Sequence, residues 1–128
     1  MKENKTNTKT PKLLFVSVPM ENSSLNKIMA MRYEALRQVR KLMNDDTIEL
    51  IDNTQKIEEI PQNTYNIPVY HVSKNIELLS KANYACFIPY FNNSRGCSIE
   101  KSVAEEYDIN IITNLDNSVF TRMDKEMY

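Results

Sequence analysis

The sequence predicts an α/β fold in which a mainly parallel sheet of four or five strands carries helices on both faces. Short apolar runs alternate with amphipathic segments along most of the 128-residue chain. The runs lack the alternation of strands that have one wet face, so we expect them to be buried on both sides, as strands of parallel sheets are. The only glycine, Gly96, follows one of these runs and precedes a helical pattern. Alternation of this kind implies parallel strands that are joined by crossover helices.

The length and the composition fit a single domain and argue against several classes of partner. A chain of 128 residues can bury a core without disulfides or metals, and its net charge of -1 argues against a nucleic-acid-binding surface. No stretch approaches the roughly 20 apolar residues of a membrane span. The two cysteines have no metal-ligand spacing, and nothing suggests a disulfide framework, so a reducing cytosol fits best. We therefore expect a cytoplasmic protein with no nucleic-acid partner, no membrane partner, no metal and no other cofactor.

The first half of the chain shows the alternation most clearly. The apolar run 12–18 is closed by Pro19 and predicts a buried strand. Two serines that can cap a helix precede the segment 25–43, where apolar residues recur at helical spacing. Its apolar face is expected to hold Leu25, Ile28, Met29, Leu36, Val39 and Met43, and its other faces Lys27, Glu34, Arg37 and Lys41.

The second half repeats this order after a long loop. Ser73 is expected to cap a helix that ends near Lys81, because the preceding segment has two prolines and no steady period. In chain order, the expected elements are strand 12–18, helix 25–43, strand 47–51, loop 52–68 with a helical turn near 55–60, helix 73–81, strand 84–88, helix 95–107 and strand 109–112. The domain then spans 12–113, between a mobile arm (1–11) and a tail (114–128) that forms a terminal helix or docks on a neighbour.

The loop before the helix at 95–107 carries the spacing Ser94-x-Gly96-x-x-x-Glu100. Ligands in such folds bind beyond the carboxyl ends of the strands, so this corner should face the loop after the first strand. Ser94 and the free backbone N–H groups of the helix can bind a phosphate or a hydroxyl. The helix N-terminus is expected to keep Glu100 ionised, as a nucleophile or base. The simpler alternative is a capping serine and an acid placed favourably in the helix dipole.

Three short stretches share their order and spacing with a known family. They read Ser17-Val18-Pro19-Met20, Ile76-Glu77-Leu78-Leu79-Ser80-Lys81-Ala82-Asn83, and Ser94-Arg95-Gly96-Cys97-Ser98-Ile99-Glu100 followed by Ala104 and Tyr107. Together they resemble the nucleoside 2-deoxyribosyltransferase superfamily, and most of all its small, mostly uncharacterised phage and bacterial branch. The resemblance covers about residues 12–113, and the corner motif is its most specific part.

The resemblance implies a flavodoxin-like or Rossmann-like three-layer sandwich with an active site at Glu100. In characterised relatives the glutamate at this position attacks C1′ of a deoxyribose and forms a glycosyl-enzyme intermediate. Another base or water then opens that intermediate, and the serine matched by Ser94 holds the 5′-phosphate where one is present. A carboxylate beneath an oxocarbenium-like ring stabilises the charge and then bonds to the ring. A homodimer or larger homo-oligomer is implied as well.

The chain departs from active relatives at two acidic positions. Asn75 matches the aspartate that helps to protonate the leaving base, and Asn83 matches a second aspartate at the end of the same helix. Asparagine cannot act as a general acid. His71, the only histidine, is suited to that role near neutral pH or is simply a residue at the helix entry. Cys97, in the first turn of its helix, has a lowered pKa or serves in packing.

These observations leave three functions open. The first is an N-glycosidase or deoxyribosyltransferase that acts on nucleosides or their 5′-monophosphates. The second is a catalytically weak or inactive nucleotide-binding protein, and the third is a scaffold or interaction protein. In the first two the partner is a small-molecule nucleoside or nucleotide. The expected catalytic residues are Glu100, His71 and Asn75, and the expected substrate-binding residues are Ser17, Pro19, Met20, Phe91, Asn92, Ser94, Arg95 and Gly96.

Overall fold

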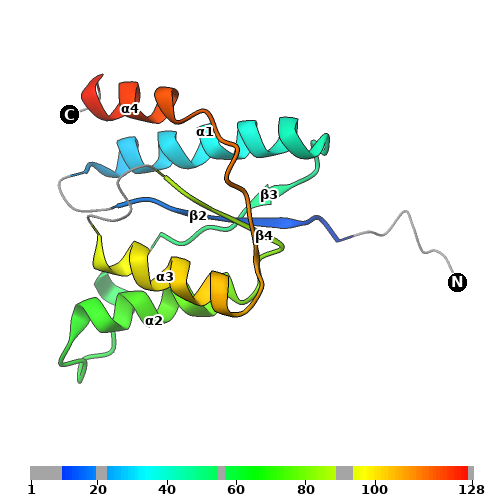
Figure 1. Ribbon diagram of the computed structural model, residues 1–128. Coiled ribbons are helices and arrows are strands. Elements are labelled where there is room, and N and C mark those ends of the chain that lie inside the picture. Colours follow the sequence, from blue (N-terminus) through cyan, green and yellow to red (C-terminus); the bar gives the residue numbers. More distant parts are fainter. Residues whose placement is uncertain (1–9, 20–22, 55–56, 89–93, 127–128) are drawn as a thin grey trace, which may run out of the picture.

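The computed structural model describes residues 10–19, 23–54, 57–88 and 94–126, in which strands and helices alternate (Figure 1). The elements are β2 (Leu13–Ser17), α1 (Leu25–Met43), β3 (Glu49–Leu50), the 3-10 turn η2 (Ile57–Glu59), α2 (Ile67–Leu79), β4 (Tyr84–Phe87), α3 (Arg95–Glu106), β5 (Asn110–Ile111) and α4 (Asn117–Glu126). The strands and helices expected from the sequence are all present. The largest difference in bounds is at the start of α2.

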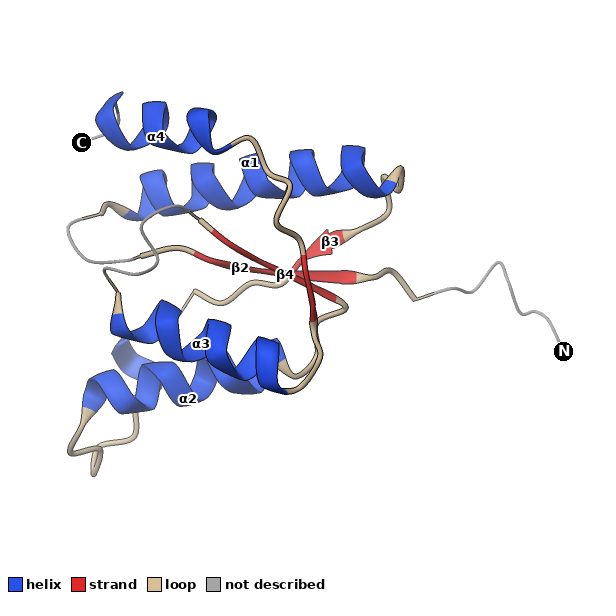
Figure 2. Ribbon diagram, viewed as in Figure 1, coloured by secondary structure: helices blue, strands red, loops and turns tan. Residues whose placement is uncertain are grey.

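The strands form one four-stranded parallel sheet in the order β3-β2-β4-β5 (Figure 2). In the central strand, β2, Leu14 pairs with Leu50 on one side and with Tyr84 on the other. Helices α1 and α4 cover one face of the sheet, and α2 and α3 cover the other (Figure 1). The predicted α/β class is confirmed as a three-layer sandwich of the flavodoxin-like or Rossmann-like kind. The strand order reverses between β2 and β4, and ligands in such folds bind beyond the carboxyl ends of the strands at this point.

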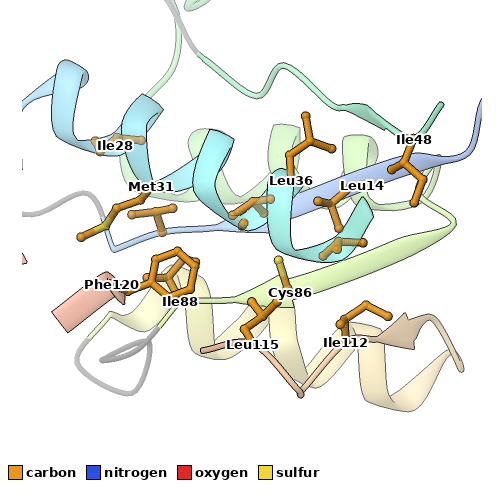
Figure 3. Close-up of a cluster of buried hydrophobic side chains, with 14 residues drawn as sticks. Leu14, Ile28, Met31, Leu36, Ile48, Cys86, Ile88, Ile112, Leu115 and Phe120 are labelled. Atoms are coloured by element: carbon orange, nitrogen blue, oxygen red, sulfur yellow. The ribbon is translucent and has the colours of Figure 1, made fainter. Parts of the chain in front are cut away.

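Side chains of β2 alternate between two separate cores. Leu14 and Val16 pack beneath α1 and α4 together with Cys86 (Figure 3). Burial raises the pKa of the Cys86 thiol to about 12, as suits a core residue. Phe15 packs on the opposite face, beneath α2 and α3. Because successive side chains of a strand point to opposite faces, Ser17 at the end of β2 also faces α2 and α3.

Helix α1 has the bounds that the sequence predicts, and both of its ends are capped. Ser24 Oγ accepts a hydrogen bond from the Lys27 backbone N–H at 3.1 Å, and Asn44 adopts the left-handed conformation at φ 51°. Two assignments of side chains to faces were wrong. Leu25 is 57% exposed, whereas Lys27 is buried and forms an ion pair with Asp124 of α4. The periodicity of α1 alone could not show that a second helix covers Lys27.

Helix α2 begins six residues before the predicted start at Ser73. Asn66 is its N-cap and accepts a hydrogen bond from the Val69 backbone N–H at 3.1 Å, while Pro68 occupies the first turn. Proline is tolerated there because the first N–H groups of a helix have no partner within the helix. Ser73 lies inside the helix and donates to the Tyr70 carbonyl at 2.7 Å. The proline that suggested a loop is therefore part of the helix start.

The carboxy-terminal segment forms a helix that packs on its own domain. Leu115 and Phe120 belong to the core beneath α1 (Figure 3). The segment thus forms a terminal helix, which was one of the two alternatives. None of the helices described here is both long and apolar enough to cross a membrane. Three expected binding residues, Met20, Phe91 and Asn92, lie outside the described residues.

Candidate functional site

A buried glutamate of α3, Glu100, lies at the carboxyl end of β2 between two hydrogen-bond donors. Glu100, in the second turn of α3, is only 3% exposed. Ser17 Oγ donates to its Oε1 at 2.7 Å, and Asn75 Nδ2 donates to its Oε2 at 3.0 Å. These residues come from β2, α2 and α3, so three elements that are far apart in sequence fix the carboxylate. The structure thus brings together three of the predicted site residues.

The amino end of α3 shapes the space next to this carboxylate. Ser94 is the N-cap, and its Oγ accepts a hydrogen bond from the Cys97 backbone N–H at 3.3 Å. A Cβ added at Gly96 would lie 3.9 Å from Glu100 Oε2, 4.0 Å from Ser94 Oγ and 3.5 Å from Val72 Cγ2. Gly96 has no positive φ, so the backbone does not require a glycine. Its missing side chain instead leaves room between the Ser94 hydroxyl and the Glu100 carboxylate.

The electrostatics of Glu100 differ from the sequence-based expectation. Burial raises the pKa of this carboxyl above its ordinary value, although Ser17 and Asn75 oppose the shift through hydrogen bonds and Arg32 opposes it through its charge. The helix N-terminus was expected to keep Glu100 ionised, whereas the pKa shift favours the neutral form. The helix dipole acts most strongly within the first turn, and Glu100 lies in the second turn. Desolvation of the carboxylate then outweighs its favourable hydrogen bonds and the charge of Arg32.

Cys97 is a packing residue and not an activated thiol. It is buried in the first turn of α3, and burial raises the pKa of its thiol despite hydrogen bonding with Ser17 and Ser94. The alternative of a lowered pKa was therefore wrong. Two predicted binding residues flank this region with more exposure: the side chain of Arg95 is exposed at the first position of α3, and Pro19 is half-buried after β2.

Asn83 lies at the amino ends of the strands, whereas Glu100 lies at the carboxyl end of β2. Its Oδ1 accepts a hydrogen bond from the Leu13 backbone N–H at 2.8 Å, and its own backbone N–H donates to the Leu13 carbonyl at 2.9 Å. These contacts tie the amino ends of β2 and β4 together. The role of Asn83 in this structure is therefore to stabilise the sheet.

His71 lies on α2 one helical turn before Asn75. Residues four apart on a helix share a face, so His71 and Asn75 project from the same side of α2. The His71 ring is half-buried and meets the Tyr70 ring edge-on, with centroids 6.0 Å apart. His71 therefore lies one helical turn before the residue whose amide donates to Glu100.

Two buried polar side chains at this end of the sheet were missed by the sequence analysis. Arg32 of α1 is 2% exposed and Asn53, three residues after β3, is 5% exposed. Arg32 Nε and Asn53 Oδ1 have no hydrogen-bond partner among the described residues. Amphipathic spacing gave no signal for them, because an arginine and an asparagine at such positions normally face water.

Comparison with known proteins adds no assignment. No protein-family model matches the chain, and no curated protein matches it significantly. Among the described residues, no group of three His, Cys, Asp or Glu side chains could hold a metal ion. The residues at the site favour chemistry carried by a carboxylate. Each Glu100 oxygen accepts one hydrogen bond from Ser17 or Asn75 and retains a lone pair that could accept from a hydroxyl or attack an electrophilic carbon.

Proposed function

We propose that this protein binds a deoxynucleoside or its 5′-monophosphate and cleaves the N-glycosidic bond through Glu100. The observation that carries the proposal is the buried carboxylate, which Ser17 and Asn75 hold at both oxygens. A carboxylate fixed in this way is preorganised to face the positive charge that develops at C1′. The substrate class comes from the resemblance of the corner motif to nucleoside 2-deoxyribosyltransferases.

The proposed reaction has two steps. First, an oxygen of ionised Glu100 bonds to C1′ while the C1′–N bond breaks, and the bonding electrons leave with the base. The base takes up a proton from His71 or from water, because Asn75 cannot supply one. Water, which gives up a proton to His71 or to solvent, or a second nucleobase then attacks C1′, and the bond from C1′ to Glu100 breaks to release the carboxylate. Ser17 and Asn75 stabilise that carboxylate as it reforms.

The amino end of α3 is the proposed site for a 5′-phosphate. Its backbone N–H groups and the positive end of the helix dipole favour an anion. Ser94 lies at that end as the N-cap, and Arg95 adds an exposed cation beside it. Ser94 Oγ lies 4.0 Å and Glu100 Oε2 lies 3.9 Å from the point that a Cβ of residue 96 would occupy, so a phosphate bound at Ser94 and an anomeric carbon at Glu100 could belong to one ligand.

Incubation with a panel of deoxynucleosides and their 5′-monophosphates tests the proposal, with free base measured by chromatography. Wild type is expected to release base from at least one substrate, and Glu100→Gln is expected to release none. Glu106→Gln, an exposed residue of the same helix, is the matched control and should retain the wild-type rate. Equal rates in wild type and Glu100→Gln, or no release from the whole panel, would refute the enzymatic proposal.

One observation favours a second candidate, a nucleotide-binding protein without turnover. Asn75 donates a hydrogen bond to Glu100 at the position where active relatives carry an acid. Under this alternative the same panel raises the melting temperature of the wild type without any base release. Asn75→Asp is then expected to gain base release, because the variant restores a group that can protonate the leaving base. The assembly into a homodimer or larger oligomer stays a prediction.

A further inference from the structure

Three charged side chains in the described part of the chain are almost completely buried. Lys27, Arg32 and Glu100 are 4%, 2% and 3% exposed, respectively. Lys27 is compensated by its ion pair with Asp124. Burying a charge is costly unless an opposite charge or good hydrogen bonds compensate it. Arg32 and Glu100 therefore remain as a buried cation and a buried anion to be explained together.

The hydrogen bonds of Arg32 do not explain its burial. Its Nη1 lies 3.5 Å from Thr54 Oγ1 and 3.5 Å from Met29 Sδ, which are long contacts to neutral acceptors. Its Nε has no hydrogen-bond partner within 10–19, 23–54, 57–88 and 94–126, the ranges that the structure describes. Burial lowers the pKa of the guanidinium, whereas the charges of Asp52 and Glu100 raise it. The compensation that Arg32 receives is thus largely electrostatic, from two carboxylates.

The topology brings Arg32 to the same strand end as Glu100. Leu14 pairs with Leu50, and the Ile51 backbone N–H donates to the Leu14 carbonyl at 2.9 Å. The chain beyond Ile51 therefore runs beside the carboxyl end of β2, where Ser17 donates to Glu100. Thr54, the contact of Arg32, belongs to this segment. Arg32 reaches the end of the sheet from α1, and Glu100 reaches it from α3 on the opposite face.

We propose that Arg32 is a positioning residue for Glu100: it is the buried counter-charge that keeps Glu100 a carboxylate inside the site. The inference deepens the proposed function and rests on it only where it concerns the reaction. In the reaction, the Arg32 cation makes the Glu100 carboxylate a better leaving group when the glycosyl ester opens. Arg32 also sets the lower pH limit of activity, because Glu100 must be ionised to attack C1′. The proposal itself concerns the ionisation of one side chain and can be measured without substrate.

The other groups around Glu100 define what the test must hold constant. In the described part of the chain, the polar groups that interact with Glu100 or Arg32 include Ser17 of β2, Asn75 of α2, Cys97 of α3, and Asp52 and Thr54 after β3. His71 lies one helical turn from Asn75 on α2. Of these groups, only the His71 imidazole can carry a positive charge. The titration is therefore repeated in the His71→Gln background.

The first test is a titration of the Glu100 carboxyl by carbon-13 NMR, with Glu100→Gln used to assign its signal. The pKa of Glu100 is expected to rise further in Arg32→Met, because desolvation is then opposed only by hydrogen bonds. Arg32→Lys is expected to restore most of the wild-type value, since it keeps the charge. Arg40→Met is the matched control on α1, where Arg40 donates to the Ile48 carbonyl. An unchanged pKa in Arg32→Met would overturn the proposal.

The second test covers the case in which Arg32→Met does not fold. Removing one partner of a buried charge pair leaves the other uncompensated, so Arg32→Met with Glu100→Gln should recover folding. If both single variants fold, their losses of stability should add up to more than the loss of the double variant. A double variant that also fails to fold, or strict additivity, would assign Arg32 to packing and refute the proposal. Failure of base release in the panel assay affects neither test.

Discussion

At the scale of single residues, the site depends on a carboxylate that the fold has removed from water. Glu100 is buried by three elements, and desolvation outweighs the donors Ser17 and Asn75 in setting its pKa. A buried carboxylate in apolar surroundings is a stronger base once it is ionised, which suits a nucleophile. The same burial makes this residue costly for stability, and that cost can be measured.

The pH dependence of stability provides the first prediction. Because the pKa of Glu100 is raised in the folded protein, the folded state binds more protons than the unfolded state between the unfolded pKa, about 4.3, and the raised pKa. This side chain therefore makes the protein less stable as the pH rises through that window. The stability of Glu100→Gln, measured relative to wild type at the same pH, should therefore be higher above that window than in more acidic solution.

Urea unfolding of both proteins across that pH range measures the effect. Ser17 and Asn75 can each turn to suit a neutral amide, so the substitution preserves the shape of the site. A Glu100→Gln variant that loses stability as the pH rises, relative to wild type, would show that the carboxylate is stabilised in the fold. That outcome would contradict the assigned direction of the shift.

Gly96 provides a second prediction, in which stability and binding change in opposite directions. The added methyl of Gly96→Ala would meet Val72 at an ordinary contact distance, and alanine favours a helix over glycine by about 0.5–1 kcal/mol. The same methyl would stand between Ser94 Oγ and Glu100 Oε2. We expect a small gain in the free energy of unfolding and at least about a tenfold loss of deoxynucleotide affinity, or ~1.4 kcal/mol.

Calorimetric titration and urea unfolding of Gly96→Ala check the two halves separately. Ser98→Ala, in the same first helical turns, is a suitable control for general effects on α3. Undiminished affinity in Gly96→Ala would mean that no ligand occupies the space between the serine and the glutamate.

Sequence reasoning identified some of these residues and not others, for physical reasons. Ser94 and Glu100 could be predicted because capping and helical spacing are local signals. The burial of Arg32 and the place of Asn83 could not, because both depend on which elements pack together. The ionisation of Glu100 was misjudged for the same reason: its desolvation comes from β2 and α2.

At the scale of elements, the two helices with weak sequence signals gain their order from tertiary packing. Helix α2 starts at a capping asparagine and a proline that fit a helix start as well as a loop. The start of α2 at Asn66 could therefore have been predicted from the sequence. The face of α2 that contacts Glu100 could not, because it depends on how α2 packs against α3. Helix α4 has scattered apolar residues, and its place on α1 follows from Phe120 and the ion pair between Lys27 and Asp124.

Phe120 tests whether α4 is an integral part of the domain. Its side chain is 1% exposed in the core beneath α1, so Phe120→Ala should lower the free energy of unfolding by about 3–5 kcal/mol. Val119→Ala, one residue earlier and half-buried, should cost much less. Urea unfolding of both variants decides the question, and equal small losses would mean that α4 is a dispensable tail.

At the scale of the whole molecule, the parallel sheet explains why the site lies where it does. In the order β3-β2-β4-β5, the chain adds β3 on one side of β2 and then β4 and β5 on the other side. The strand order therefore reverses between β2 and β4, and β2 ends there with Ser17. Helices from both faces contribute to that edge, since Asn75 and Glu100 come from one face and Arg32 from the other. This architecture could be predicted from buried runs and amphipathic helices, because both patterns follow from burial on two sides.

The most direct test of the account is a crystal structure of Glu100→Gln soaked with a deoxynucleoside 5′-monophosphate. The variant preserves the shape of the site and prevents the proposed reaction, so the bound ligand should stay intact. We expect C1′ next to the side chain at position 100 and the phosphate at Ser94 and the amino end of α3. A ligand bound elsewhere, or an empty site at saturating nucleotide, would contradict the assignment of this edge of the sheet as a nucleotide site.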